Sequence, residues 1–554
     1  MTPMRPSFNL LDEPWIRVTR LDGASDEVSL LAVFREATDI SGIHGEIASQ
    51  DVAILRLLLA ICHRTMGGPE NMDTWEKYWD DPGRLGRDAV AYLESYRDRF
   101  DLRDPERPFF QVAGIQGAIS PVSKLIIDTP KDINRSLFTT RIGDGLKELS
   151  WREAARWLIH AHAFDPAGLR SGAVGDPRRK PNGTTPPNGA GWAGQIGVVY
   201  VKGRNLRQTL LLNTVSVDAV DSMNSVDMEF DLPPWEAHAQ ATPFCETSSS
   251  PTGPSYCFTW QTRRVLLHGD NTVSGVFIGN GSKATPQNRQ TVETMTSWRR
   301  SSTQEKKLRL PLVFMPKEHK SDEAFWRGLA SIIPQLGEAN RNTNTSYMHP
   351  AIIEFYQTLI LRNIVSNTGI IPLHAVGIMY NPPDKKSSVK ELFDDTLSLP
   401  AGLLDPTNTR LLGVVHDAME ETEGVASALR NLAANLDKAR GGSPDTASAA
   451  RDHAGAAFYQ LIDERFPRWL ASLDGADPAE ARDKWRSLLR SEARKQQEAL
   501  ASAVPDTAFA GRGEGKGRMD VGRALSYFRT ALNKAVPPFE PQNAPIEDGE
   551  RTSA

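Results

Sequence analysis

The sequence predicts an α+β protein: a mixed N-terminal body over residues 1–400, with several β-strands and helices, followed by a C-terminal four-helix bundle over 401–537. Short alternating apolar runs in the body indicate strands. Four long helical patterns after residue 403, with no strand among them, indicate the bundle. The last residues, 538–554, are rich in proline and charged side chains and are predicted to be a disordered tail.

The elements of the two regions can be placed individually. Strands are expected at Trp15–Thr19, Val28–Leu30, Val198–Val201, Thr209–Asn213, Cys257–Trp260 and Val273–Ile278. Helices are expected over 51–64, 88–100 and 151–164 in the body, and over Thr409–Ala439, His453–Leu473, Pro478–Val504 and Asp520–Val536 in the bundle. Asp51 can cap the first helix, and Ser150 with Glu153 has the spacing of a capping box.

Composition excludes several classes of protein. The chain has 554 residues, 40% of them hydrophobic, so it can bury a sizeable core, and its net charge of −5 excludes a uniformly basic nucleic-acid coat. The most apolar run, Ala53–Cys62, carries Arg56 and is about half the length that a membrane span needs. Three cysteines without CxxC spacing fit a reducing compartment. We therefore expect a cytoplasmic protein without a membrane segment.

The sequence contains no complete motif of an enzyme or cofactor site, so no catalytic residue, metal or cofactor is predicted. The GxGxxG pattern at 189–194 lies in a Gly/Pro-rich stretch, without the preceding strand and following helix of a dinucleotide site. The GRGEGKGR segment at 511–518 lacks the first glycine and the Ser/Thr of a phosphate-binding loop. His160 and His162 are two residues apart and point to different faces of a helix.

Basic residues are concentrated in three parts of this acidic chain. Residues 166–213 carry seven basic side chains and one acid, 260–309 carry nine against three, and 478–534 carry twelve against seven. Two of these patches lie in glycine-containing loops, where a bare backbone can approach a phosphate or a groove. The charge pattern leaves two interpretations open, a nucleic-acid interface or ordinary solvated loops.

Specific basic side chains are candidates for contacts with the DNA backbone. In the loop region these are Arg178, Arg179 and Lys180. In the third bundle helix, arginines recur every four residues and share one face, which makes Arg486, Arg490 and Arg494 candidates. The alternative is a solvated helix in which Glu492 and Glu498 are the partners of these arginines.

An ordered set of segments resembles one protein family. The segments are FNLLDEPWIRV at 8–18, RPFFQVAG at 107–114, PVSKLI at 121–126, FDPAGLRSG at 164–172, GWAGQIG at 191–197 and LRQTLLLN at 206–213. Their order and spacing resemble those of the large subunit of the type I-E CRISPR surveillance complex, Cascade. The similarity runs from residue 8 into the C-terminal helices.

The resemblance implies a non-catalytic subunit in antiviral defence. Members of this family assemble with the other Cascade subunits and the CRISPR guide RNA. They recognise the protospacer-adjacent motif of double-stranded target DNA, start the strand separation that forms the R-loop, and recruit a helicase-nuclease. The glycine loop that meets the motif is similar to Ala167, Gly168 and Leu169, and the lysine that enters the minor groove is similar in placement to Lys283.

Two further family features can be placed by similarity. The loop that docks on the 5′ handle of the guide resembles residues 128–141, with Asn134, Leu137 and Phe138 as its contacts. The wedge hairpin that parts the DNA strands falls after Tyr380, and its candidate residues are Asn381, Pro382, Asp384, Lys385 and Lys386.

This chain departs from the family at the wedge and near the lysine. Better-known relatives carry glutamine at the wedge tip, whereas this tip has prolines and lysines. Some relatives have a cysteine cluster near the lysine, whereas only Cys245 and Cys257 are nearby here. Two other functions stay open: an architectural scaffold that bridges subunits without reading the motif, and a nuclease with an unrecognised site.

Overall fold

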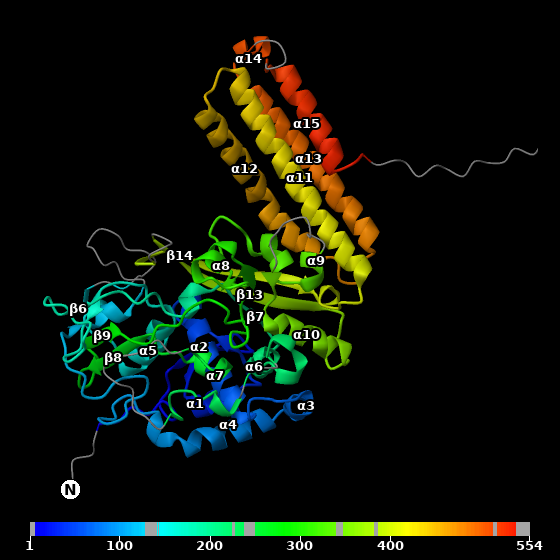
Figure 1. Ribbon diagram of the computed structural model, residues 1–554. Coiled ribbons are helices and arrows are strands. Elements are labelled where there is room, and N and C mark those ends of the chain that lie inside the picture. The colour runs from blue at the N-terminus through cyan, green and yellow to red at the C-terminus, as the bar shows by residue number, and fades with distance from the viewer. Residues whose placement is uncertain are drawn as a thin grey trace, which may run out of the picture. The chain divides into compact units, whose positions relative to one another are not determined.

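The computed structural model describes residues 6–538, except 128–140, 142, 224–225, 227, 238–249, 339–346, 382–385 and 514–517 (Figure 1). The chain divides into two compact units, Met1–Thr407 and Asn408–Ala554. The first unit contains helices and small sheets, and the described part of the second unit is mainly helical. The predicted α+β class is therefore confirmed.

The N-terminal part of the first unit joins a small sheet to four helices. The strands are β1 (Ile16–Arg20), β2 (Ser25–Val28) and β3 (Ile40–Ile43), and the helices are α1 (Leu30–Arg35), α2 (Ala48–Thr65), α3 (Met72–Asp80) and α4 (Arg84–Ser95). The strand expected at Val28–Leu30 is partly wrong, because Ser29 caps α1 and Leu30 is already helical. Helix α2 begins before Asp51, whose carboxylate accepts a hydrogen bond from the Gly45 amide.

Helix α5 (Trp151–Phe164) leads directly into the candidate site. Its predicted capping box is present: the Ser150 hydroxyl and the Glu153 carboxylate each bind the other residue's amide. His160 and His162 are fully buried on this helix. Nε2 of His160 lies 3.0 Å from the Ser49 hydroxyl, and Nε2 of His162 lies 2.9 Å from the Phe110 carbonyl oxygen. Both histidines thus belong to the packing of α5 and have no partner of metal-ligand type there.

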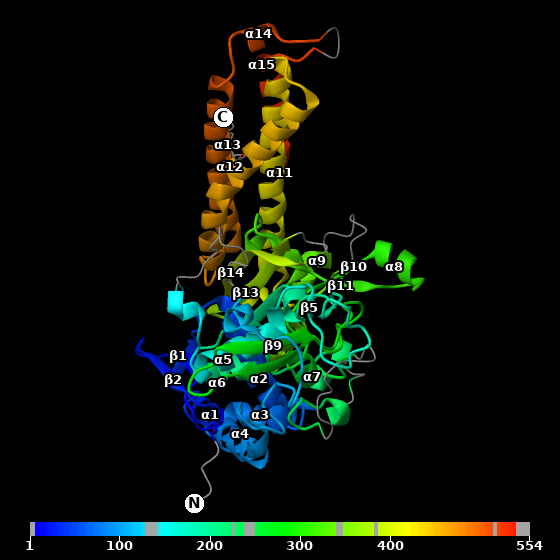
Figure 2. The same cartoon turned by 90° about the vertical axis from the view of Figure 1, so that its left-hand side faces the viewer.

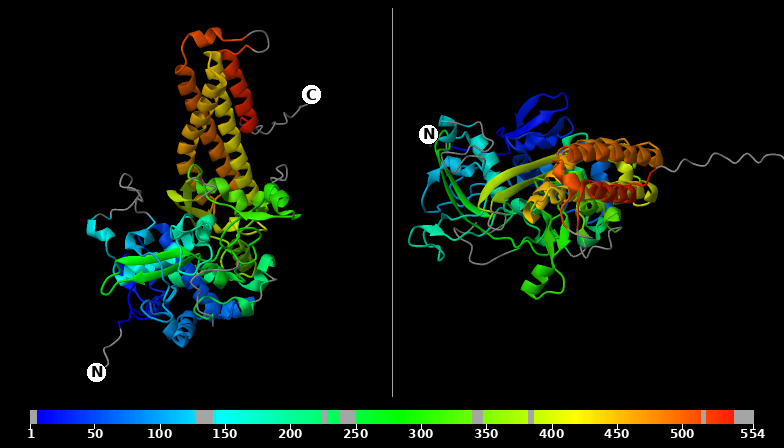
Figure 3. Two further views of the ribbon diagram at one scale, coloured as in Figure 1. Left: turned by 60° about the vertical axis from the view of Figure 1, so that its left-hand side comes forward. Right: turned by 90° about the horizontal axis from the view of Figure 1, so that it is seen from above.

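Three small sheets surround the end of α5. Strands β5 (Arg170–Ser171) and β6 (Thr184–Thr185) form a hairpin, and β8 (Arg263–His268) and β9 (Gly275–Asn280) form a second one with β4 (Ser120–Pro121) at its edge. The β8–β9 pair runs side by side in Figures 2 and 3. The third sheet has the order β14-β13-β7 and contains β7 (Val198–Val201), β13 (Ile370–Asn381) and β14 (Ser388–Pro400).

Two of the predicted strands are wrong, because the segments are helical. Thr209–Asn213 belongs to α6 (Leu206–Asn213), and Cys257 belongs to α7 (Pro254–Phe258). The Asn205 side chain caps α6 by accepting from the Gln208 amide. Nearly all of α6 is buried, so its apolar run lacks the alternation that separates helix from strand.

The other helices and strands of the first unit lie between β9 and β13 in the sequence. They are β10 (Trp298–Arg300), α8 (Ser302–Leu308), β11 (Phe314–Pro316), α9 (Pro334–Glu338), β12 (Tyr347–Met348) and α10 (Ala351–Leu361). Strand β10 is the centre of a sheet with the order β11-β10-β12.

The second unit packs its helices around α11. The helices are α11 (Thr409–Ala439), α12 (Pro444–Ala471), α13 (Pro478–Ser502), the short α14 (Thr507–Ala510) and α15 (Val521–Ala535). Helix α12 begins nine residues before the predicted His453, because Ser443 caps it and Pro444 occupies the first turn, where proline is tolerated. Throughout the part of the chain that the structure describes, no helix is both long and apolar enough to cross a membrane.

Candidate nucleic-acid interface

The segment after α5, residues 165–172, is called the glycine loop here, and a buried carboxylate fixes its start. Asp165 accepts two hydrogen bonds from Arg170, at 3.1 Å from Nε and 2.6 Å from Nη2, and forms an ion pair with Arg263. Burial alone would raise the pKa of the Asp165 carboxyl, but the charges of Arg170 and Arg263 outweigh it and hold the pKa below its usual value. Asp165 is therefore ionised, and the cluster keeps one net positive charge.

Arg263 also holds the backbone of the loop. Its Nη2 donates to three carbonyl oxygens, at 3.1 Å from Asp165, 3.0 Å from Pro166 and 3.0 Å from Gly189. This side chain is completely buried. The five donors of a guanidinium in one plane make such multiple bonding possible, and a lysine could not reproduce it. Sequence analysis missed Asp165 and Arg263, because nothing in the sequence links two charges so far apart.

The middle of the glycine loop presents backbone groups and an apolar side chain. Ala167 is buried, and its amide donates to the Lys386 carbonyl at 2.7 Å. Neither the amide nor the carbonyl of Gly168 has a hydrogen-bond partner among the described residues. Leu169 is 56% exposed. The loop is thus fixed on both sides of Gly168, while the Gly168 backbone itself stays available to an outside partner.

The basic triplet Arg178–Lys180 lies between β5 and β6, but its three side chains differ. Arg178 donates to both oxygens of the Asp176 carboxylate, at 3.0 and 2.9 Å. Arg179 and Lys180 are exposed. Arg178 therefore stabilises the turn, and Arg179 and Lys180 are the members of the triplet that can reach a phosphate.

The residues that follow β9, 281–284, are called the Lys283 loop, and they are tied to the glycine loop. The Asn188 side chain donates to the Gly281 carbonyl at 3.0 Å and accepts from Nη1 of Arg263 at 2.9 Å. A Cβ at Gly281 would lie 2.8 Å from the Gln261 carbonyl oxygen, so the close backbone approach requires glycine. Lys283 is exposed and has no ion-pair or hydrogen-bond partner among the described residues.

The end of the β13–β14 hairpin touches the glycine loop. Tyr380 donates from its hydroxyl to the Phe164 carbonyl at 2.6 Å. Nζ of Lys386 lies 2.5 Å from the Glu318 carboxylate and 3.3 Å from the Gly194 carbonyl oxygen. Asn381 is exposed, and its carbonyl accepts from the hydroxyls of Ser387 and Ser388. Lys386 is therefore a half-buried anchor of the hairpin.

Several predicted residues lie outside the described part of the chain. They are the guide-docking residues Asn134, Leu137 and Phe138, the wedge residues Pro382, Asp384 and Lys385, and Cys245. The other two cysteines, Cys62 and Cys257, are buried free thiols. Within the described residues there is no group of three or more His, Cys, Asp or Glu side chains that could hold a metal ion.

The arginine face of α13, formed by Arg482, Arg486, Arg490 and Arg494, belongs to the second unit. Glu421 of α11 accepts from Arg482 and from Arg486, at 2.6 and 2.8 Å. Arg490 bonds to the Asn533 side chain and the Val536 carbonyl of the same unit. Arg494 is exposed and has no partner among the described residues.

Glu492 and Glu498, the carboxylates expected to pair with this face, do not pair with its arginines among the described residues. Glu492 pairs with Lys495 at 2.9 Å, and within the described residues no contact joins Glu498 to an arginine of the face. Across the bundle, Glu421 pairs with Arg482 and Arg486, and Asp417 pairs with Arg482. Of the candidates in this helix, Arg494 is the one whose charge is free of contacts with described residues.

Residues 9–496 match the family model of the CRISPR-associated protein Cse1. The chain belongs to this family. The match spans the glycine loop, the Lys283 loop and the β13–β14 hairpin, which the structure brings together in the first unit. The family resemblance drawn from the sequence is thereby confirmed.

Individual Cse1 proteins are similar over nearly the whole chain. The crystal structure of Thermobifida fusca Cse1 has a TM-score of 0.85 and 35% identity, covering 97% of this chain and 99% of that one. The CasA/Cse1 protein of Thermus thermophilus is 26% identical over 94% of this chain and 97% of its own length. A chain of a CRISPR RNA-guided surveillance complex shares the fold, with a TM-score of 0.70 at 18% identity over 96% of this chain and 99% of that one.

Proposed function

We propose that this protein is the large subunit of a type I-E Cascade complex and acts there by binding, without catalysing a reaction. Its membership of the Cse1 family supports this proposal, as does the fold that it shares with a chain of a CRISPR RNA-guided surveillance complex. Its partners are the other subunits and the guide RNA, and it works in the cytoplasm. Asn134, Leu137 and Phe138 are proposed to dock on the 5′ handle of the guide.

Recognition of the protospacer-adjacent motif is proposed to lie at the glycine loop and the Lys283 loop. The observation that carries this proposal is their common attachment: Arg263 holds the carbonyls of Asp165 and Pro166 at the start of the glycine loop and, through Asn188, the carbonyl of Gly281. The free Gly168 backbone and the unpaired Lys283 ammonium are thus set on one rigid support. Such a pair suits the minor groove, whose acceptors largely distinguish A·T from G·C and little more.

This chemistry predicts permissive recognition. A backbone group and one lysine provide few directional contacts, so several related motifs should be accepted, with modest differences in affinity. A scan of all trinucleotides measures this directly. A single accepted trinucleotide, with every relative rejected by about 10⁴-fold, would contradict minor-groove reading of this kind.

Strand separation is proposed to occur at the β13–β14 hairpin, which bonds to the glycine loop through the Lys386 carbonyl. Opening one base-pair step costs about 1–2 kcal/mol, so a wedge has to offset only a few steps before pairing with the guide takes over. Asn381, Pro382, Asp384 and Lys385 are the proposed wedge residues, and Lys386 is proposed to hold the hairpin in place. The helicase-nuclease is then recruited to the opened target.

The test is a titration of guide-loaded complex with duplex DNA that contains a permitted motif, at fixed salt. The variants are Lys283→Ala and Gly168→Asp. A Cβ at Gly168 lies 3.1 Å from Nη1 of Arg170, so an aspartate there adds a negative charge beside the loop's own cation. Lys77→Ala is the matched control, because Lys77 is an exposed lysine on α3 far from these loops in sequence. Both test variants should lose motif discrimination while the complex still assembles.

The outcomes separate the three functions. If binding and discrimination are unchanged in both variants, the chain is a scaffold and the motif-reading proposal is wrong. If the purified complex degrades DNA with magnesium and without the helicase-nuclease, the subunit or a neighbour is a nuclease. A fluorescent base beside the motif reports strand opening, which Lys385→Ala should impair while leaving motif discrimination intact.

A further inference from the structure

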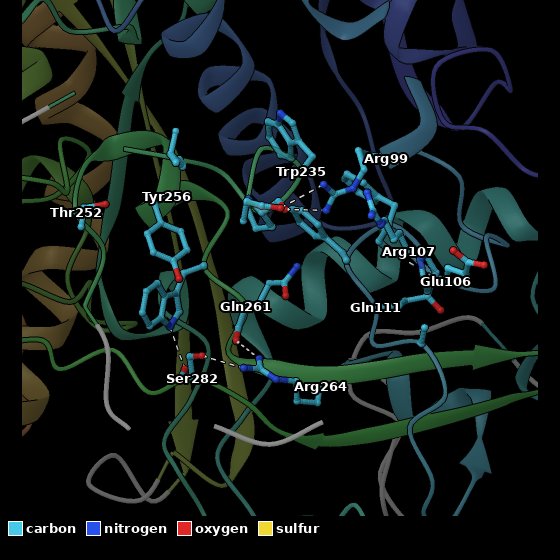
Figure 4. Close-up of a pocket in the computed structure, with 18 of the residues that line it drawn as sticks. Arg99, Glu106, Arg107, Gln111, Trp235, Thr252, Tyr256, Gln261, Arg264 and Ser282 are labelled. Atoms are coloured by element: carbon cyan, nitrogen blue, oxygen red, sulfur yellow. Dashed lines mark hydrogen bonds between the residues drawn. The ribbon is translucent and has the colours of Figure 1, made fainter. Parts of the chain in front are cut away.

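A cavity of about 500 Å³ in the first unit, called the arginine–aromatic pocket here, lies beside the Lys283 loop (Figure 4). Ser282 is part of its lining and directly precedes Lys283. Pockets of 300–1,000 Å³ are typical of sites for small molecules. The proposed motif reading does not use this pocket.

Aromatic rings form much of its wall. Phe109 and Trp235 have their ring centroids 6.3 Å apart in a stacked arrangement, and Tyr256 and Trp260 have theirs 5.0 Å apart. All four residues line the pocket. Phe109, Trp235 and Trp260 are buried, so the half-buried Tyr256 is the ring of these four that can present a face to a ligand. Stacking of a nucleobase on such a ring is largely independent of the base.

A strained residue supports the aromatic wall. Phe110, which also lines the pocket, has a φ of 55°, a conformation that a bulky side chain rarely adopts. Its ring stacks on Phe109 with centroids 4.2 Å apart, and its carbonyl accepts the hydrogen bond of His162. These contacts hold Phe110 in place and orient the ring of Phe109.

The same pocket is strongly cationic. Arg99, Arg107 and Arg264 line it, and Glu106 is the one acidic side chain among its lining residues. No carboxylate of the described residues pairs with Arg99 or Arg107. Nη1 and Nη2 of Arg99 each lie 3.3 Å from a neutral carbonyl oxygen, of Ala237 and Pro234. Burial and the charge of Arg107 lower the pKa of Arg99 by more than the charge of Asp98 raises it.

Figure 4 shows how the two features are combined: Arg99 and Arg107 lie together on one side of the pocket, and Tyr256 lies on the other. A guanidinium binds phosphate oxygens in a two-pronged geometry, and an aromatic wall binds a planar ring. We propose that the arginine–aromatic pocket binds a single unpaired nucleotide, with its base against the aromatic wall and its phosphate at Arg99 and Arg107. This proposal is independent of the motif-reading proposal.

A lone phosphate or a lone apolar ring fits this wall less well than a nucleotide does. Inorganic phosphate does not use the ring of Tyr256, and a nucleoside brings no anion to Arg99 and Arg107. The nucleotide can come from RNA or from single-stranded DNA. The two sources differ in the 2′-hydroxyl, which only a ribonucleotide can offer to polar lining groups such as Gln261.

The test is calorimetric titration of the full-length protein with adenosine 5′-monophosphate, its 2′-deoxy form, adenosine and inorganic phosphate. Arg107→Ala is the main variant, because Arg107 is exposed and its loss leaves no buried carboxylate unpaired. It should weaken binding of the monophosphate about tenfold and leave the affinity for adenosine unchanged. Arg87→Ala, which removes an exposed arginine of α4 outside the pocket, is the matched control and should have no effect.

Tyr256→Leu tests the other half of the site and should weaken the monophosphate and adenosine equally. A stronger response to the ribonucleotide than to the deoxy form assigns the site to RNA, and the reverse assigns it to DNA. The proposal is overturned if neither monophosphate binds at millimolar concentration. It is also overturned if inorganic phosphate binds as tightly as the nucleotide, or if Arg107→Ala and Arg87→Ala behave alike. Loss of motif discrimination in Lys283→Ala complexes has no bearing on these results.

Discussion

The glycine loop and the arginine face of α13 are both basic in the sequence, but the structure uses their charges in different ways. In the α13 face, Glu421 accepts from Arg482 and Arg486, so two of the four cations stabilise the bundle. At the glycine loop, two arginines share Asp165, and the resulting support leaves the Gly168 backbone and the nearby Lys283 unpaired. A sequence therefore shows where positive charges are. Whether such a charge can bind a ligand depends on whether the folded protein pairs it with a carboxylate.

The comparison is tested most strongly at Arg263. Arg263→Met removes the buried partner of Asp165 and of three carbonyls, so we expect the first unit to lose about 3–5 kcal/mol of stability. Urea denaturation followed by circular dichroism measures this loss. Arg87→Met is the control, since its ion pair with Asp81 is exposed and should contribute little. Equal midpoints for the two variants would show that the glycine loop is not held by Arg263.

The bundle has its own test at Glu421. Glu421→Gln leaves Arg486 with a neutral acceptor, while Arg482 keeps its ion pair with Asp417, and the second unit should lose about 1.5–3 kcal/mol. The matched control is Glu498→Gln on α13, an exposed residue that the structure does not place on the arginines. Urea denaturation of the two variants measures and compares their losses of stability. A larger loss of stability in Glu498→Gln than in Glu421→Gln would instead support the solvated helix proposed from the sequence, in which Glu498 is a partner of the arginines.

Within the basic triplet, a paired arginine and an exposed arginine can be compared in a single turn. Arg179→Ala should lower the slope of log affinity against log salt for DNA binding by about one, as expected for one lost phosphate contact. Arg178→Ala should leave this slope unchanged, because Arg178 is paired with Asp176. Binding isotherms at several salt concentrations measure both slopes. The same slope in the two variants would mean that ion pairing within the turn does not control access to DNA.

The smallest expected effect concerns pH at the helix beneath the glycine loop. Burial lowers the pKa of His162 to about 4, so the folded protein keeps this residue neutral while the unfolded chain takes up a proton near pH 6.5. The stabilising contribution is complete above pH 6.5 and is lost as the pH falls below it. Between pH 6.5 and 5.5, the wild type should lose about 1 kcal/mol more stability than His162→Gln. Parallel losses in the two proteins would exclude this histidine as a source of acid sensitivity.

Local signals in the sequence predicted much of the fold. The capping box at Ser150 and Glu153 placed α5, and the long amphipathic patterns placed α11, α13 and α15. The errors are in short buried segments: α6 and α7 were taken for strands because burial on every side removes the periodicity that distinguishes the two structures. The start of α12 was missed because its first turns have no apolar stripe.

Of the candidate site, only the residues proposed to contact the ligand could be predicted from the sequence. Gly168 could be proposed from resemblance because it lies in a segment that matches the family, and Lys283 because its placement is similar to that of the family's lysine. The ion pair and hydrogen bonds that connect the two loops could not be predicted. Asp165, Asn188 and Arg263 are ordinary polar residues in the sequence, and they acquire this role only when folding brings them together. The arginine–aromatic pocket was missed for the same reason, since Arg99, Trp235 and Tyr256 come from separate segments.

The dependence of the glycine loop on later parts of the chain has a consequence during synthesis on the ribosome. Asp165 and Pro166 leave the exit tunnel well before Arg263, and the Ala167 amide acquires its partner only when Lys386 has been made. At about 5–20 residues per second, the loop waits on the order of ten seconds or longer for its last anchor. A nascent chain that ends before Lys386 therefore lacks this anchor of the glycine loop, and the ability to engage a ligand there arises only after most of the first unit has been made.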